Sequence, residues 1–388
     1  MMAWLPVFFM YFSASLSISE VLILESIYYL SVVILEIPSG YFSDKIGRRT
    51  TLIISSLAFT VAYFLFGFIS PSFILLVCAQ ILLACGMSFL SGTDTAFYYE
   101  SLEAANLEHE YIEREADIQT KKQIASAVAV LLGGILGSFQ LRFGYVLSLV
   151  FILPALIISW KFKEPNHDQE NQTGNFIQQI RSVKNEILKP ELKWIFLFSI
   201  NLFILSHIPY EFYQSYLELL EGNNMGLGIH AAIYSGIVFA LTRVFGAFAS
   251  SMSPKWLLKY GLKKLCIAAI FFQLAIIGGM AIILHIGIVF IILMRSFSMS
   301  LTAAPINAEI APRLNENHRA TYFSFQSLAS RLSYSLTLLG LTIVIGSETN
   351  KWLSLSTILT TSFILGLILL IPLFFINSGK LFDTNLKS

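Results

Sequence analysis

The feature that most constrains this chain is the repetition of apolar segments long enough to cross a membrane. A helix needs about 20 mainly apolar residues to span the hydrocarbon core of a bilayer. Segments of this kind follow one another along the whole chain, near residues 1–16, 19–43, 49–69, 72–98, 120–140, 143–161, 192–216, 229–252, 262–284, 286–310, 319–346 and 352–377. The sequence therefore predicts an all-α polytopic membrane protein with twelve transmembrane helices.

The composition supports the same fold class. Only 13% of the residues are charged and 56% are hydrophobic, whereas soluble domains carry about 25% charged residues. The net charge of +1 gives no reason to expect a nucleic-acid partner. The three cysteines, Cys78, Cys85 and Cys266, lie inside apolar segments, so neither a disulfide framework nor a metal site is expected. The start of the chain has no basic leader, and no cleavable signal peptide is expected.

The first apolar segment is short. Residues 1–16 would rise only about 24 Å as a helix, and Ser17–Glu20 has the pattern of a capping box that opens the second helix. Two interpretations stay open: the first helix is short, or the natural chain starts further upstream.

Lysine and arginine are distributed unequally between the two sides of the predicted membrane. With the N-terminus in the cytoplasm, the outside loops hold only Arg142 and Lys351. Cytoplasmic segments have more basic residues than outside segments in most membrane proteins. The sequence therefore predicts a protein of the cell (inner) membrane with both termini in the cytoplasm. The predicted cytoplasmic loops hold Lys45, Arg48, Arg49, Arg114, Lys121, Lys122, Lys161, Lys163, Arg181, Lys184, Lys189, Lys193, Lys255, Lys259, Lys263, Lys264, Arg313, Arg319, Lys380 and Lys387.

The longest polar interruption divides the chain into two groups of six helices. Residues 1–161 form the predicted N-terminal bundle, 162–191 a cytoplasmic linker and 192–388 the C-terminal bundle. Apolar residues between Phe176 and Ile187 recur at helical spacing, which fits an amphipathic helix on the inner leaflet. A solvated, disordered linker is the alternative.

The two predicted bundles share a weak internal repeat. Ile27-Tyr28 and Gly40 correspond, at one constant offset, to Ile233-Tyr234 and Gly246. Parallel repeats of this type occur in transporters built from two related halves.

A short charged turn between the second and third apolar segments carries the most specific pattern. Residues 36–50 resemble the signature loop of the major facilitator superfamily, of form G-x-x-x-D-[RK]-x-G-R-[RK]. The matching residues are Gly40, Asp44, Lys45, Gly47, Arg48 and Arg49. Two further stretches resemble a drug-efflux-like bacterial branch: residues 91–102, SGTDTAFYYESL, with Glu100 in place of an Asp, and the RATxxSxxSLxxR pattern of residues 319–331.

The resemblance implies two six-helix bundles related by a pseudo-two-fold axis. In that fold helices 1, 4, 7 and 10 line a central cavity, helices 2, 5, 8 and 11 lie beside them, and helices 3, 6, 9 and 12 face lipid. Ionisable residues inside membrane segments usually face a cavity or a partner, and here they avoid helices 3, 6, 9 and 12. They are Glu25 and Glu36 in helix 2, Asp94 in helix 4, His207 and Glu211 in helix 7, Arg243 in helix 8, Arg295 in helix 10 and Arg331 in helix 11.

The signature turn is predicted to form a cytoplasmic latch. The resemblance places Asp44 at the start of helix 11, where the helix dipole favours an anion. Arg48 and Arg49 are expected to pair with Glu100 or Glu103 at the end of helix 4. These contacts, with the glycines Gly40 and Gly47, would hold the cytoplasmic side closed in one state and break in the other. The alternative is that the basic residues serve only membrane topology.

The first candidate for proton coupling is Asp94, with Tyr98 one turn further along the same face as a candidate cavity residue. A carboxylate in a poorly hydrated site can take up and release a proton as access alternates. A structural partnership with the signature arginines or with Glu36 is the alternative. Glu36 is itself a second candidate, and Glu25 is a candidate for the substrate cavity.

Helix 7 carries a polar stripe of His207, Glu211, Gln214 and Glu218. We interpret it as a cavity wall with a further proton site at Glu211 or His207, or alternatively as an outer gate or wetted rim.

Two arginines in the second half are candidates for the substrate cavity. Arg295 has Ser298 and Thr302 on its face, and Arg331 has Ser327 and Ser335 on its own. Both would bind an anionic group of the substrate or neutralise carboxylates of the first half.

These patterns together predict a secondary active transporter that moves a small organic solute by alternating access. The proton gradient is the expected driving force, with no bound cofactor or metal. Efflux of amphipathic compounds is the first prediction, and transport of an anionic metabolite or carboxylate siderophore is the alternative. A membrane-bound sensor without turnover is the alternative of another class. An enzyme is not expected, since His207 has no second His or Cys at ligand spacing. The predicted partners are the solute and the bilayer, and the chain is predicted to be a monomer.

Overall fold

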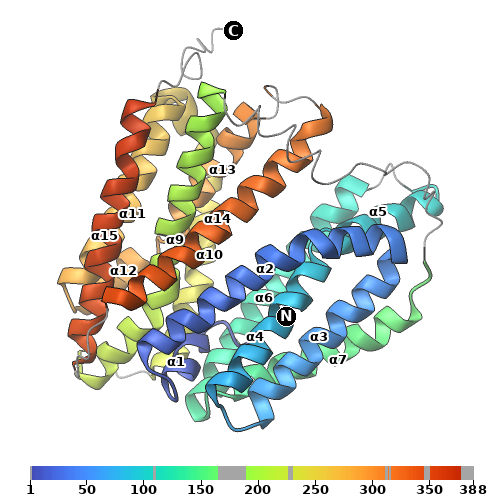
Figure 1. Cartoon of the computed structure of the whole chain (residues 1–388), viewed down its shortest axis with the longest axis horizontal. Helices are drawn as coiled ribbons and strands as arrows, with labels where there is room; N and C mark the ends of the chain where they lie inside the picture. Colours follow the sequence, from blue (N-terminus) through green and yellow to red (C-terminus); the bar gives the residue numbers. More distant parts are fainter. Residues whose placement is uncertain are drawn as a thin grey trace. The chain divides into compact units, whose positions relative to one another are not determined.

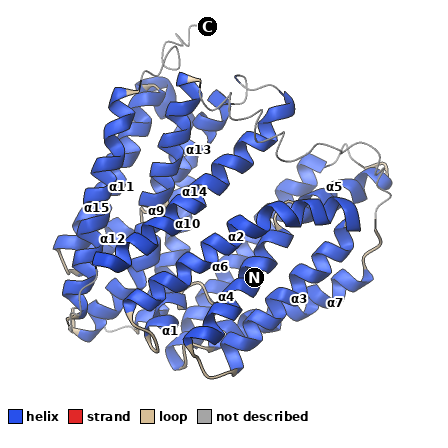
Figure 2. Ribbon diagram, in the orientation of Figure 1, coloured by secondary structure: helices blue, strands red, loops and turns tan. Residues whose placement is uncertain are grey.

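The computed structural model describes residues 2–107, 111–164, 189–225, 230–310, 313, 316–344 and 350–376. All secondary structure within these ranges is helical (Figures 1 and 2). Ten spans in this part of the chain are long and apolar enough to cross a membrane, and Ile124–Phe139 is a shorter apolar helix. The predicted fold class, an all-α polytopic membrane protein, is confirmed.

The chain divides into two compact units. Unit 1 holds Met1–Thr173 and His230–Ile237, and unit 2 holds Gly174–Ile229 and Val238–Ser388. Residues 165–188 of the predicted linker, including its proposed amphipathic stretch, lie outside the described residues.

Unit 1 is built on a layer of helices packed around α3 and α4. In this unit α3 packs against both α4 and α7, and α2 packs against α4. Its helices are α1 (Phe8–Ser13), α2 (Ile18–Ile46), α3 (Arg48–Phe68), α4 (Phe73–Leu90), α5 (Thr93–Ala104), α6 (Tyr111–Phe139) and α7 (Phe143–Lys161).

The first apolar segment forms only a short helix, α1, preceded by turns. The side chains of this segment are nevertheless buried, because its aromatic rings pack against a tyrosine of α7. The Trp4 ring stacks on Tyr145 of α7 with centroids 5.7 Å apart, and the Tyr11 ring lies 4.9 Å from the same tyrosine. Gly133 of α6 allows this close approach, since a Cβ there would lie 1.8 Å from the carbonyl oxygen of Ala3.

The predicted capping box opens α2. The Ser17 hydroxyl accepts a hydrogen bond from the Glu20 amide at 3.4 Å, and the Glu20 carboxylate accepts one from the Ser17 amide at 2.8 Å. Two amides that the helix leaves without internal partners are satisfied in this way.

Unit 2 is organised around α9. This helix packs against α11, α14 and α15, and α11 also packs against α13 and α15. The Trp194 indole of α9 donates a 2.8 Å hydrogen bond to the carbonyl of Leu373. The helices are α9 (Pro190–Gly222), α10 (Ala231–Tyr260), whose first turns belong to unit 1, α11 (Leu262–Ile282), α12 (Ile286–Ile292), α13 (Phe297–Ile310), α14 (Glu316–Val344) and α15 (Lys351–Phe375).

Each unit contains one apolar segment that is broken into two helices. In unit 1, α4 and α5 are separated at Ser91 and Gly92, and Gly92 has a positive φ of 76°. In unit 2, α12 and α13 are separated by the turn 293–296, which contains neither glycine nor proline. Discontinuous helices of this kind bring irregular backbone to functional sites in transporters.

Large apolar side chains are exposed on α3, α7, α11 and α15. In a chain that spans a membrane, such faces are satisfied by lipid. The family resemblance places these four helices against lipid, but large apolar side chains are also exposed on α2, α6, α10 and α14, so the exposed faces do not separate the two groups of helices. Examples are Leu57, Phe64 and Phe68 on α3, Val150 and Ile157 on α7, Phe271 and Ile282 on α11, and Ile364, Ile368 and Phe375 on α15.

Candidate functional site

The charged turn between α2 and α3 is held by an ion pair. Gly47 has a φ of 113°, a conformation that L side chains rarely adopt, and it lets α3 begin directly after α2. The Arg48 guanidinium then reaches Glu100 of α5, with Nε and Nη2 at 3.2 and 3.1 Å from Oε1. The Arg48 Nη1 group also donates to the Ser43 hydroxyl at 2.9 Å. The contact expected between Arg48 and Glu100 is therefore present.

A second carboxylate, that of Glu164, occupies the N-terminus of α3. It accepts hydrogen bonds from the backbone amides of Arg48 and Arg49 at 2.5 and 2.9 Å. Anions are favoured there because the first amides of a helix lack internal partners and the dipole is positive at this end. The Arg49 Nη2 group donates a 2.8 Å hydrogen bond to the Trp160 carbonyl. The sequence predicted instead a pairing of this arginine with Glu100 or Glu103.

For three other members of the predicted latch, Gly40, Asp44 and Glu103, the structure gives no latch contact among the described residues. Gly40 lies within α2, and a Cβ at this position would meet no atom within 4 Å. The side chains of Asp44 and of Arg319, at the expected start of helix 11, lie outside the described residues. Glu103 is exposed on α5.

Asp94 lies in the first turn of α5, directly after the helix break. Its Oδ1 accepts from the Thr95 amide at 2.9 Å, and Lys122 of α6 approaches Oδ2 at 3.8 Å. The Asp94 side chain is 41% exposed. The poorly hydrated environment expected for this carboxylate is therefore absent in this conformation.

The other unit 1 candidates differ in burial. Glu25 is 6% exposed and accepts a 2.9 Å hydrogen bond from the Gln80 side chain on α4. Glu36 is half-buried, and its Oε2 has no hydrogen-bond partner among the described residues. Tyr98 is half-buried on α5. The best-shielded carboxylate of this group is thus Glu25.

Unit 2 contains a pocket of about 260 Å³ between α9, α13 and α14. Its lining mixes aromatic and aliphatic side chains with hydroxyl and amide groups. Thr302 and Ser330 donate to carbonyls of their own helices, whereas no internal hydrogen bond is recorded in the described chain for the Asn307 and Gln326 amides. The lining residues are Phe198, Ser199, Leu202, Phe203, Met299, Thr302, Ala303, Ile306, Asn307, Phe323, Gln326, Ser327 and Ser330.

Arg295 lies in the turn between α12 and α13 and is only 4% exposed. Its guanidinium carbon lies 4.2 Å from the ring centroid of Tyr213, with Tyr210 at 5.8 Å and Phe239 at 5.6 Å. Aromatic faces stabilise a cation in this geometry. The Arg295 Nη1 group has no hydrogen-bond acceptor within the described part of the chain.

The polar stripe on α9 is buried at its centre, and its two ends, His207 and Glu218, are half-buried. Glu211 and Gln214 are both fully buried. The Tyr334 hydroxyl of α14 lies 3.3 Å from the Glu211 carboxylate and 3.3 Å from the His207 carbonyl. The His207 ring stacks on Phe203 at 3.8 Å. The structure therefore joins His207 and Glu211 through one tyrosine of a neighbouring helix.

The last cavity candidate, Arg331, is half-buried on α14. It is absent from the pocket lining, although Ser327 on the same helix face is present.

The sequence model of the Major Facilitator Superfamily matches residues 1–338. The chain belongs to this superfamily.

Solved structures agree in fold with this superfamily member. A mutant of the nucleoside transporter NupG superposes with a TM-score of 0.79 at 12% identity, covering 96% of this chain and 95% of that one. A D-xylose-proton symporter gives 0.63 at 13% identity, with 95% and 93% covered. An auto-inhibited POT family peptide transporter gives 0.69 at 12% identity, with 95% and 92% covered. The search of curated proteins found no match.

Membership of the superfamily identifies the chain as a multi-pass membrane transporter of a small solute, a class that is not enzymatic in general. Membership also allows the pocket helices to be matched with the helix order of the superfamily. In the superfamily order of helices, α9, α13 and α14 are parts of helices 7, 10 and 11. The pocket is therefore on the helices that the superfamily resemblance assigns to the cavity and its border.

The sequence indicated some of the residues at this candidate site but not others. In the sequence, Thr302 and Ser327 stand out only as neighbours of the arginines. Asn307 and Gln326 do not stand out at all, because single amides near helix ends are common and have no characteristic spacing. Glu164 falls in the predicted linker. Its position three residues after the end of α7 is the one feature that could have indicated a role close to the helix ends.

Proposed function

We propose that this protein is a secondary active transporter that expels an amphipathic organic solute by alternating access, driven by the proton gradient. The observation that carries the solute class is the lining of the pocket between α9, α13 and α14. It offers aromatic rings such as Phe203 and Phe323 beside the amides of Asn307 and Gln326. Ligand pockets are mainly apolar with a few polar groups that fix orientation, and an amphipathic solute satisfies both parts.

Proton coupling is supported by the carboxylates near membrane depth and by analogy. Glu211 with Tyr334 and Glu25 with Gln80 are buried carboxylates that could exchange a proton. Asp94 is more exposed but stands at a helix break. One structural neighbour is, by its title, a proton symporter. The protonation site is therefore proposed among Glu211, Glu25 and Asp94.

The test of the solute site is dye efflux in everted membrane vesicles energised by a proton gradient. Asn307→Ala and Gln326→Ala should each lower the initial rate at subsaturating dye by about two- to tenfold, since each removes a polar contact worth about 0.5–1.5 kcal/mol. The matched control is Thr342→Val, a half-buried position at the far end of α14 and outside the pocket lining. Equal rates in all variants would refute the site.

The test of coupling uses Asp94→Asn, Glu211→Gln and Glu25→Gln in the same vesicles. If one of these carboxylates is the protonation site, its amide variant should abolish gradient-driven flux. The same variant should still exchange solute across the membrane when no proton gradient is present. Exchange and driven flux that fall together in every variant would argue against these carboxylates as the protonation site.

A second candidate, transport of an anionic solute such as a carboxylate, is favoured by Arg295. The guanidinium is buried with an Nη1 group that has no acceptor in the described chain. It also precedes the N-terminus of α13, where the helix dipole adds positive potential. A carboxylate reaching this turn would be attracted by both.

The two candidates are separated by ligand-dependent stabilisation of the purified protein. Binding to the folded state raises the apparent melting temperature with ligand concentration. If the solute is anionic, carboxylates should stabilise the wild type, and Arg295→Gln should weaken that effect while stabilisation by neutral amphiphiles persists. Stabilisation by amphiphiles alone would remove the anionic candidate.

Several accompanying features belong to the same proposal. The turn at Arg48 acts as a cytoplasmic latch, the protein is a monomer of the inner membrane, and both termini are cytoplasmic. A sensor without turnover is distinguished by flux: reconstituted protein that binds solute but gives no flux above empty liposomes would favour the sensor.

A further inference from the structure

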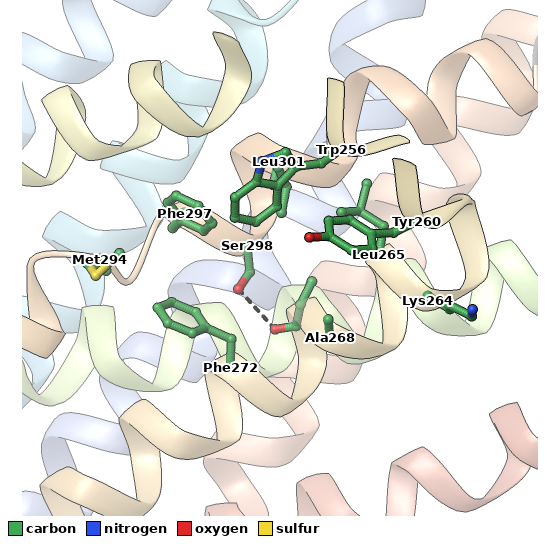
Figure 3. Close-up of a pocket in the computed structure, with 11 residues that line it drawn as sticks. Trp256, Tyr260, Lys264, Leu265, Ala268, Phe272, Met294, Phe297, Ser298 and Leu301 are labelled. Atoms are coloured by element: carbon green, nitrogen blue, oxygen red, sulfur yellow. Dashed lines mark hydrogen bonds between the residues drawn. The ribbon is translucent and has the colours of Figure 1, made fainter. Parts of the chain in front are cut away.

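A second cavity in unit 2 lies away from the proposed solute pocket. It has a volume of about 420 Å³ and is bounded by the end of α10, the first half of α11 and the start of α13 (Figure 3). Its walls are almost entirely apolar, with Phe272, Met294 and Phe297 at one end. At the end of the cavity that holds Lys264, α10 and α11 are joined by a tight turn at Gly261, which has a φ of 76°.

The cavity has one polar end and one apolar end. Figure 3 shows Lys264 on the side of Tyr260, away from Met294 and Phe272. The Ser298 hydroxyl, a polar group among the apolar residues of the wall, donates to the Ala269 carbonyl at 2.9 Å, and the Trp256 indole and the Tyr260 hydroxyl belong to lining residues near Lys264. The interior therefore offers little to a polar ligand and accommodates a hydrocarbon chain.

The depth of the cavity matches one leaflet of a bilayer. From Lys264 to Phe272 is eight residues of α11, a rise of about 12 Å, whereas half the hydrocarbon core is about 15 Å. Trp256, Tyr260, Lys264 and Ala268 are exposed along one side. Tryptophan and tyrosine are typical of the membrane interface, so this side opens at the boundary between headgroups and lipid tails.

The charge around the opening is positive and has no acidic residue nearby in sequence. Lys255, Lys259, Lys263 and Lys264 surround the α10–α11 turn, and the chain has no Asp or Glu from residue 222 to 308. No ion pair to Lys264 is recorded in the part of the chain that the structure describes. Basic pockets between membrane helices on the cytoplasmic side favour anionic lipid headgroups.

We propose that this cavity is a binding site for one anionic phospholipid, with an acyl chain along Phe272 and Phe297 and the headgroup phosphate at Lys264. Lipid tails surround the chain in the membrane, and an unfilled cavity of this size would lose the dispersion contacts of its walls. The lysines select an anionic headgroup over a zwitterionic one. The site is independent of the solute pocket and of the proposed direction of transport.

The test is lipid retention by the purified full-length protein, measured by native mass spectrometry. The probes are phosphatidylglycerol and phosphatidylcholine with identical chains. Phosphatidylglycerol should bind more tightly, and Lys264→Gln should weaken it about fivefold. Ala268→Phe, which fills the opening from an exposed position, should weaken both lipids. The control is Lys263→Gln, which removes the same charge from the same turn at a residue outside the cavity lining.

A second measurement locates the chain within the protein. Phosphatidylglycerol with a brominated tail should quench the fluorescence of Trp256, and the quenched component should disappear in Trp256→Phe and shrink in Ala268→Phe. Equal retention of the two lipids with equal loss in Lys264→Gln and Lys263→Gln would overturn the proposal, since it describes only bulk lipid. So would normal lipid retention in Ala268→Phe with a loss of solute flux, which would make the cavity part of the solute route.

Discussion

The ion pair between Arg48 and Glu100 should be a measurable determinant of unit 1 stability. The two groups are 3.1 Å apart, and their side chains are only 12% and 13% exposed. Hydrogen bonds to charged groups contribute about 1.5–3 kcal/mol when largely shielded, whereas fully exposed ion pairs contribute about 0.2–1 kcal/mol. Because some exposure remains, we expect a coupling energy of about 1–2 kcal/mol.

The perturbation is a double-mutant cycle with Arg48→Gln and Glu100→Gln. Either single variant should cost about 2–3 kcal/mol, because it leaves the other charge largely buried without its main counter-ion. The double variant should cost less than the sum of the singles by the coupling energy. Reversible unfolding in mixed detergent measures all four free energies.

A matched control is available in the same unit. Lys122 and Asp94 are 3.8 Å apart with side chains 62% and 41% exposed, so their cycle should give no more than about 0.5 kcal/mol. A coupling of Arg48 with Glu100 that does not exceed this control would refute the reasoning. It would also weaken the proposed latch, because a coupling of 1–2 kcal/mol is what can shift a conformational equilibrium by about 5–30-fold.

Three further predictions concern local geometry, each measured by the same unfolding assay. Gly47→Ala should cost about 1–3 kcal/mol, since φ is 113° and the new Cβ would lie 2.8 Å from the Glu164 carboxyl; a neutral result would contradict the strain. Glu164→Gln should cost about 0.3–1 kcal/mol by removing an anion from the start of α3, an effect that high salt should reduce. Ser17→Ala and Asn350→Ala should each cost about 1 kcal/mol as lost helix caps, whereas Ser138→Ala, at a half-buried position that caps no helix N-terminus, should change little.

The fold could be predicted from the sequence because membrane burial imposes a strong and local signal. Every unsatisfied backbone group in lipid is costly, so apolar length alone indicates a helix. The capping box at Ser17 was equally local and is present in the structure. The pairing of Arg48 with Glu100 was predictable for a different reason: both belong to patterns that resemble one family, and the resemblance supplied the distance that the sequence does not contain.

The parts that were missed depend on neighbours far apart in the chain. Glu164 reaches the start of α3 across more than a hundred residues. No periodicity marks such a partner. The aromatic cage around Arg295, formed by the rings of Tyr210, Tyr213 and Phe239, also depends on distant parts of the chain, because Tyr213 and Phe239 lie on two other helices. The sequence indicated that a buried arginine needs a partner, but an anion was expected, and aromatic faces supply much of the stabilisation.

The two helix breaks show how the same architectural need is met by different chemistry in the two units. At Gly92 the backbone adopts a positive φ, and Asp94 then stands in the first turn of α5, where the dipole favours an anion. At the second break no glycine is present, and Arg295 stands before the first turn of α13, where the dipole opposes a cation. A cation in that place needs compensation, which the aromatic cage provides only in part because the Nη1 group lacks an acceptor in the described chain. The first break is therefore electrostatically satisfied without a ligand, and the second is the one that an anion would stabilise further.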